Sequence, residues 1–184
     1  ARYAFNNSVI MNKGAGLYFH PIADPVMEKI GKKGKTTEFI YHDALVEESI
    51  LYFILYKFAK DLPADIKSYI DSFTQTRTKT LTEVVKENVV EIVVDEETGE
   101  EKEVKKVVSK NVTTEVSYEY TTLVEDFGKD EKFLELLNDM LAKKDTYSLM
   151  VGEDLITHPN SENLAKLCGI IDRYTEFNVV IIPT

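Results

Sequence analysis

Three histidines, each next to a segment predicted to be a β-strand, are the side chains best suited to acid–base or metal chemistry: His20, His42 and His158. In open α/β sheets, ligand crevices lie beyond the carboxyl ends of the strands, so His42 and Asp43 could meet residues 152–154 there. The histidine spacing matches no zinc-binding helix, and a histidine followed by proline is typical of a turn or a helix cap. We therefore predict no catalytic residue and no metal ligand.

Motifs for nucleophilic catalysis and for phosphate binding are missing from the sequence. It contains no G-x-S-x-G, no G-x-G-x-x-G and no G-x-x-x-x-G-K-[ST]. The single cysteine, Cys168, lies in a predicted helix beside inward-facing positions, where we expect a buried and unreactive thiol. The chemistry-bearing residues therefore define no enzyme class by themselves.

The segment at 146–183 positions the third histidine. An apolar run ends at Gly152, a polar loop follows, and apolar residues at helical spacing lead to a second apolar run. This pattern predicts a strand, a loop, a helix and a second parallel strand, joined by a right-handed crossover. We expect Gly152 to provide a close or left-handed backbone, and His158 to start the helix together with Pro159 and Asn160.

Patterns elsewhere predict strands at 17–19 and 38–41, an almost entirely apolar helix at 46–60, a helix after Pro63 and an amphipathic helix at 130–144. Together these elements predict an α/β fold, mainly a parallel sheet with helices on both faces. Residues 83–122 alternate β-branched and charged side chains around an acidic stretch, which predicts an antiparallel β-hairpin excursion. Its acidic tip could bind a basic partner or could be a solvated turn.

Length and charge limit the remaining possibilities. The chain has 184 residues and a formal net charge of -10, which disfavours nucleic acids and anionic membrane surfaces as partners. No apolar run reaches the length of a membrane span, and the single cysteine excludes an internal disulfide. We therefore expect a cytoplasmic, single α/β domain at 1–184 with a β-hairpin insertion at 83–122. We also expect a fragment of a longer chain, because the sequence ends directly after a predicted core strand.

The loop at 151–159 resembles the strand-end loop of molybdopterin oxidoreductases, in which a Gly, an Asn-Pro and a His-Pro line the site for the nucleotide part of the cofactor. Here Gly152 and His158 followed by Pro159 are kept, but Asp154 and Leu155 replace the Asn-Pro, and the spacing from Gly to His is shorter. The added carboxylate would repel a pyrophosphate group. This loop is similar to that of the large peripheral-arm subunit of bacterial respiratory NADH-quinone oxidoreductase. Further segments that resemble this family are GLYFHP at 16–21, DP at 24–25, NLAKL at 163–167 and YTEFNVVIIP at 174–183.

The resemblance covers the two α/β portions and not the hairpin, and it implies a structural role in electron transfer from NADH to quinone. The family keeps the molybdopterin-enzyme scaffold but is generally without the molybdenum cofactor. The resemblance therefore implies no cofactor in this fragment and iron–sulfur clusters elsewhere in the parent subunit. It also implies the rest of that subunit and other peripheral-arm subunits as partners, at the cytoplasmic face of the inner membrane.

Two alternatives to this structural role stay open. The first is a cofactor-binding segment of a true molybdopterin oxidoreductase, for which Gly152, Asp154 and His158 are the candidate cofactor-binding residues. The second is a non-enzymatic protein-interaction domain whose acidic hairpin recruits a partner. Cysteine clusters of the ferredoxin type in the full-length protein would favour the structural role over both.

Overall fold

The computed structural model describes residues 14–25, 28–29, 37–94, 101–142 and 146–182 of the chain. Within these ranges, six strands and six helices form a mixed α/β protein, which confirms the predicted fold class at that level. The chain divides into two compact units: one combines Ala1–Gln75 with Thr121–Thr184, and the other is Thr76–Tyr120. No helix in the described ranges is long and apolar enough to cross a membrane.

The N-terminal part of the larger unit holds a parallel strand pair. β1 (Gly16–His20) pairs with β2 (Thr37–Tyr41), and the first and last residues of one strand lie opposite those of the other. Between the two strands, the Glu28 amide donates to the Asp24 carbonyl at 3.0 Å, as in a helical turn. Parallel neighbours need such a crossover connection.

The C-terminal part holds a second parallel pair in the predicted strand–helix–strand order. β5 (Tyr147–Val151) pairs with β6 (Phe177–Ile181), and α8 (Ser161–Tyr174) lies between them in the chain. The polar loop predicted after β5 contains a short helix, α7 (Glu153–Thr157). A helix of this length is too short to show a hydrophobic period, so no sequence pattern marks it.

The parallel strands form two separate two-stranded sheets in the described chain. In the second sheet, Val151 is buried, whereas Met150 and its register partner Val180 are 45% and 44% exposed. A parallel sheet is normally covered on both faces. The outer face of the β5–β6 pair therefore stays open within the part of the chain that the structure describes.

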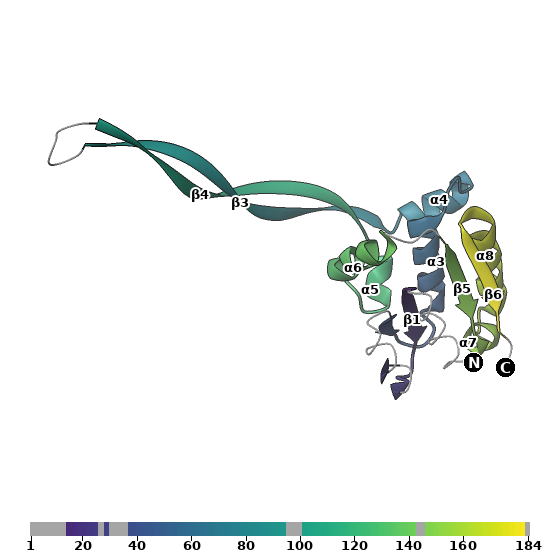
Figure 1. Cartoon of the computed structure of the whole chain (residues 1–184). Coiled ribbons are helices and arrows are strands. Elements are labelled where there is room, and N and C mark those ends of the chain that lie inside the picture. Colours follow the sequence, from purple (N-terminus) through teal and green to yellow (C-terminus); the bar gives the residue numbers. More distant parts are fainter. Residues whose placement is uncertain (1–13, 26–27, 30–36, 95–100, 143–145, 183–184) are drawn as a thin grey trace. The chain divides into compact units, whose positions relative to one another are not determined.

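Helix α3 (Glu47–Phe58) is the central helix of the larger unit, as its apolar sequence predicts. It packs against α8 and against α5 (Leu123–Asp126), and it also contacts α4 (Ala64–Asp71). In Figure 1 it runs between α5 on one side and β5 with α8 on the other. Its buried apolar residues are Ile50, Leu51, Phe53, Ile54 and Leu55.

A cluster of phenylalanine rings fills the core between α3 and α6 (Glu131–Leu141). Phe127 is 1% exposed, and its ring centroid lies 5.6 Å from that of Phe19, 5.5 Å from that of Phe53 and 5.9 Å from that of Phe133. Edge-to-face rings at such distances add to the hydrophobic effect of burial. The cluster therefore joins β1, α3 and α6 into one core.

The smaller unit is a twisted two-stranded ribbon (Figure 1). β3 (Thr74–Val94) pairs with β4 (Glu101–Thr121). The connection at 95–100 is too short for parallel strands, so the pair is an antiparallel hairpin. The predicted excursion starts at residue 83, whereas β3 starts at Thr74. The prediction missed residues 74–80 because threonine alternates with polar residues there and no apolar side chain marks the strand. Most of the predicted acidic tip lies outside the described residues.

Candidate functional site

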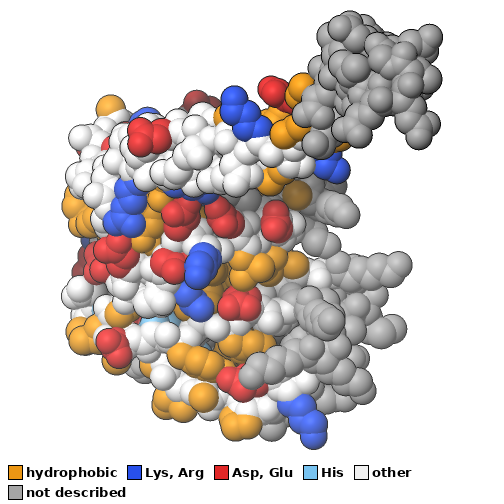
Figure 2. All heavy atoms as spheres, turned by 90° about the vertical axis from the view of Figure 1, so that its left-hand side faces the viewer, with side chains coloured by type: hydrophobic (Ala, Val, Ile, Leu, Met, Phe, Trp, Pro, Cys, Tyr) orange, Lys and Arg blue, Asp and Glu red, His pale blue; other side chains and the backbone are white. Residues whose placement is uncertain are grey.

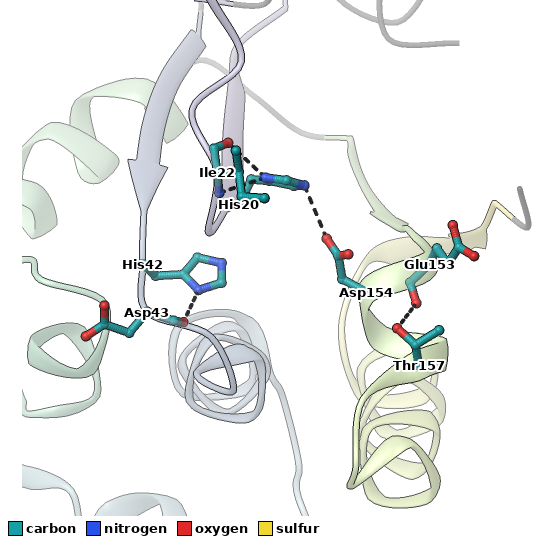
Figure 3. Close-up of polar contacts among 7 residues, drawn as sticks. All are labelled: His20, Ile22, His42, Asp43, Glu153, Asp154 and Thr157. Carbon is teal, nitrogen blue, oxygen red and sulfur yellow. Dashed lines mark hydrogen bonds and ion pairs between the residues drawn. The ribbon is translucent and has the colours of Figure 1, made fainter.

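The carboxyl ends of β1 and β5 meet through a histidine and an aspartate (Figure 3). His20 is the last residue of β1, and Asp154 lies in the first turn of α7, directly after β5. His20 Nε2 is 3.3 Å from Asp154 Oδ2, and the two side chains are 32% and 54% exposed. Because solvent screens this pair, the contact orients the two loops but contributes little stability.

His42, the histidine that could have met residues 152–154, turns back on its own chain. Its side chain is buried, and its Nδ1 atom is 2.7 Å from the backbone oxygen of Asp43. The structure therefore brings His20, and not His42, to Asp154. The prediction used only the positions of strand ends, and these do not reveal which strand of the first pair lies nearer to β5.

The third histidine, His158, is buried against α3. Its Nδ1 atom accepts a hydrogen bond from the Asn160 amide at 2.9 Å, so the neutral ring carries its proton on Nε2. Nε2 lies 3.5 Å from Oε2 of Glu47, and the two side chains are only 5% and 10% exposed. Neither of these facing atoms has a hydrogen-bond partner in the described chain. Each group therefore depends on the other for electrostatic compensation.

Glu48 makes a second link between the same elements. Its carboxylate accepts hydrogen bonds from the side-chain amides of Asn163 at 2.6 Å and of Asn160 at 3.4 Å. Glu47 and Glu48 occupy the first turn of α3, where the helix dipole favours negative charge. The turn at His158 and the start of α8 are therefore anchored to the start of α3.

His20 and His158 make the same kind of local turn. Each is followed by proline, and the Nδ1 atom of each lies within hydrogen-bond distance of the amide two residues later, 3.0 Å for Ile22 and 2.9 Å for Asn160; Nδ1 of His20 also lies 2.9 Å from the Ile22 carbonyl oxygen. Each Nε2 atom faces a carboxylate from a distant part of the sequence. In His158 the lone pair of the neutral ring is on Nδ1 and accepts from the backbone, so it is not available to a general base. The two histidines therefore act as ties between elements.

The thiol and the metal-binding residue types add no further chemistry in the described chain. Cys168 is buried on α8, and burial raises the pKa of its thiol, which keeps the side chain protonated and unreactive. Within the described ranges, no group of three or more His, Cys, Asp or Glu side chains could hold a metal ion. Among the residues that the structure describes, no catalytic candidate is therefore found beyond those considered from the sequence.

The candidate cofactor-binding residues lie in different surroundings. Gly152 and Asp154 are exposed, whereas His158 is buried against Glu47. A pyrophosphate at the start of α7 would meet the carboxylates of Glu153 and Asp154 and would be repelled. The residues present therefore do not fit the nucleotide part of a molybdopterin cofactor.

Gly152 does not have the backbone expected from its residue type. It precedes α7 with φ −94° and ψ −172°, an extended conformation open to most residues, and a Cβ atom there would meet nothing within 4 Å. The expectation of a close or left-handed backbone is therefore wrong. Among the glycines that the structure describes, Gly128, in the turn before α6, has a positive φ of +68°.

These two glycines form a matched pair of substitutions. Gly128→Ala should lower the free energy of unfolding by about 1 kcal/mol, because alanine resists a positive φ. Gly152→Ala should change it by less than about 0.5 kcal/mol, since neither the backbone nor the space around it opposes a methyl group. Urea unfolding followed by circular dichroism measures both values. Equal losses at the two positions would contradict the assigned backbone conformations.

The described surface on the face shown in Figure 2 carries acidic, basic and apolar side chains side by side. No extended surface of basic side chains is visible among the coloured residues of that face. Binding to a phosphate backbone requires such a surface.

Glu47 is the residue of this site that the sequence analysis did not single out. It begins the most apolar helix of the described chain, so a buried first turn was predictable from the pattern. Its partner His158 was not predictable, because the two residues lie in different halves of the larger unit.

Comparisons of this chain with protein-family models, with curated proteins and with solved structures found no match. The resemblance of the sequence motifs to the large peripheral-arm subunit of NADH-quinone oxidoreductase therefore stays a prediction.

Proposed function

We propose that this chain is a structural segment of the large peripheral-arm subunit of an NADH-quinone oxidoreductase. In this role it supports electron transfer from NADH to quinone without catalytic residues or cofactors of its own. The observation that carries the proposal is the contact between His20 and Asp154, at the loop where the similar molybdopterin enzymes bind the nucleotide part of their cofactor. A carboxylate in that loop disfavours an anionic cofactor.

In the proposed parent protein, the two parallel pairs belong to one sheet with helices on both faces. The exposed side chains of Met150 and Val180 favour this arrangement, because parallel sheets are normally buried on both sides. The covering strands and helices would come from the rest of the same subunit, which would also hold the iron–sulfur clusters. Other peripheral-arm subunits would be further partners, at the cytoplasmic face of the inner membrane.

The double variant Glu153→Gln/Asp154→Asn tests the proposal in the parent complex. NADH-quinone turnover in membranes should stay within about twofold of the wild-type value, because neither carboxylate takes part in chemistry. Assembly should also be unchanged, since the contact with His20 is exposed to solvent. Loss of turnover with unchanged assembly and stability would mean that the loop carries chemistry.

Two further measurements separate the proposal from its alternatives. An affinity-tagged, full-length parent protein should retain NADH-quinone oxidoreductase activity and iron when purified from solubilised membranes, and a preparation with neither would overturn the proposal. Calorimetric titration of the 184-residue chain with a guanine dinucleotide cofactor should show no binding. Micromolar binding would instead favour a true molybdopterin oxidoreductase. The other candidate, a protein-interaction domain, is favoured by the exposed valines of β3 and β4.

A further inference from the structure

One face of the β3–β4 ribbon carries an ordered set of apolar side chains. The Arg77 guanidinium carbon lies 3.5 Å from the centroid of the Tyr120 ring, and Lys79 Nζ lies 5.2 Å from that of Tyr118. These contacts place odd-numbered residues of β3 and even-numbered residues of β4 on the same face, because successive side chains of a strand alternate between faces. We call this the valine face. Its apolar members are Leu81, Val85, Val89, Val108, Val112 and Val116.

The exposure of the apolar residues agrees with this division. The six on the valine face are between 37% and 42% exposed, whereas Val84 and Val107, on the opposite face, are 63% and 60% exposed. Apolar neighbours on the valine face therefore cover one another in part. They nevertheless remain far more exposed than a core, and a two-stranded hairpin is only marginally stable by itself. The valine face is thus an apolar surface that a partner would stabilise.

Polar side chains fill the positions between the apolar ones, and the charges have opposite signs on the two strands. The apolar residues recur at every fourth position of each strand, about 13 Å apart. The exposed residues between them are Glu83 and Glu87 on β3, and Lys110 and Thr114 on β4. Between Leu81 and Val89 the β3 edge of the valine face is therefore acidic, whereas Lys110 makes the facing part of the β4 edge basic; Arg77 and Lys79 add basic side chains to the β3 edge before Leu81.

We propose that the valine face docks onto the valine face of a second copy of this chain, about a two-fold axis that runs along the ribbon. This axis places β3 of one copy over β4 of the other, so that apolar side chains meet apolar side chains. It also brings the edge with Glu87 over the edge with Lys110 of the second copy. A second copy is favoured over an unrelated partner because the valine face itself carries the acidic, the basic and the apolar side chains that would meet across the interface.

Size and charge suit a weak dimer. Residues 77–89 span about 40 Å, and a two-stranded ribbon is about 10 Å wide, so two facing ribbons would bury roughly 800 Å² in total. That area lies below the range of stable specific complexes, as expected for a dimer that depends on concentration. Segments 76–94 and 101–120 contain equal numbers of basic and acidic residues, so the net charge of -10 is carried outside them. Repulsion between copies is therefore small along these two segments, whereas the connection at 95–100 carries four acidic side chains.

Sedimentation equilibrium of the 184-residue chain tests this dimer. The wild-type chain should shift from monomer towards dimer between about 10 µM and about 1 mM. Val85→Thr/Val112→Thr keeps β-branched side chains but removes apolar groups from the valine face, so its dimer should be about tenfold weaker. The matched control Val84→Thr/Val107→Thr makes the same change on the opposite face and should associate like the wild type.

Charge reversal shows whether the contact lies between copies. Glu87→Lys alone brings two basic edges together, and Lys110→Glu alone brings two acidic edges together, so each variant should stay monomeric. An equimolar mixture of the two should dimerise, because each variant then supplies the charge that the other lacks. Circular dichroism of every variant checks that its strands are retained.

Three results would overturn the proposal. The first is a wild-type chain that stays monomeric over the whole concentration range. The second is an equal loss of association in the two double-threonine variants, which would exclude a specific role of the valine face. The third is a charge-reversed mixture that associates no better than its components.

Discussion

Truncating Phe127 to alanine should lower the free energy of unfolding by about 3 to 5 kcal/mol. The ring is 1% exposed and packs edge-to-face against phenylalanines from β1, α3 and α6. Its removal therefore leaves a cavity between elements that are held apart by their other contacts. Urea unfolding followed by far-UV circular dichroism measures the loss.

Leu136→Ala is the matched control for this substitution. Leu136 lies on α6, like one partner of the Phe127 ring, but is 39% exposed. Its truncation should lower the free energy of unfolding by less than about 1 kcal/mol, because little apolar surface returns to water and no cavity forms. A loss at Phe127 as small as that at Leu136 would show that the ring cluster is not packed.

Replacing His158 by leucine should lower the free energy of unfolding by about 3 to 5 kcal/mol, because it leaves the buried Glu47 carboxylate without a compensating group. His158→Asn separates the two contacts of the imidazole. Its side-chain oxygen can still accept from the Asn160 amide, as asparagine does in Asx turns, but nothing then faces Glu47. A similar loss in both variants would assign the effect to the pair with Glu47. Chemical denaturation at neutral pH supplies the values.

Two further variants complete this experiment. His20→Leu removes the other histidine tie and should change the free energy of unfolding by less than about 1 kcal/mol, because its pair with Asp154 is open to solvent. The double variant His158→Leu/Glu47→Leu should be more stable than His158→Leu alone, since it removes the uncompensated charge as well. If the double variant lost the sum of both single effects, the two side chains would not be coupled.

The longer elements could be predicted because their signals are local. The apolar faces of α3 and the helical spacing of Leu164, Leu167 and Ile171 on α8 follow from residues a few positions apart. The strand–helix–strand order around α8 follows for the same reason. The short helix α7 and the first part of β3 escaped prediction, since one has too few residues for a period and the other lacks apolar side chains.

The sequence by itself determined the longer helices and strands, and that the strands on either side of α8 run parallel. Only the tertiary structure decided that His20 meets Asp154, that His158 is buried against Glu47, and that His42 turns back to its own loop. The tertiary structure also decided that Gly152 has an ordinary extended backbone. The physical reason is that hydrophobic periodicity acts within one element, whereas a contact between side chains far apart in the sequence depends on how separate elements pack.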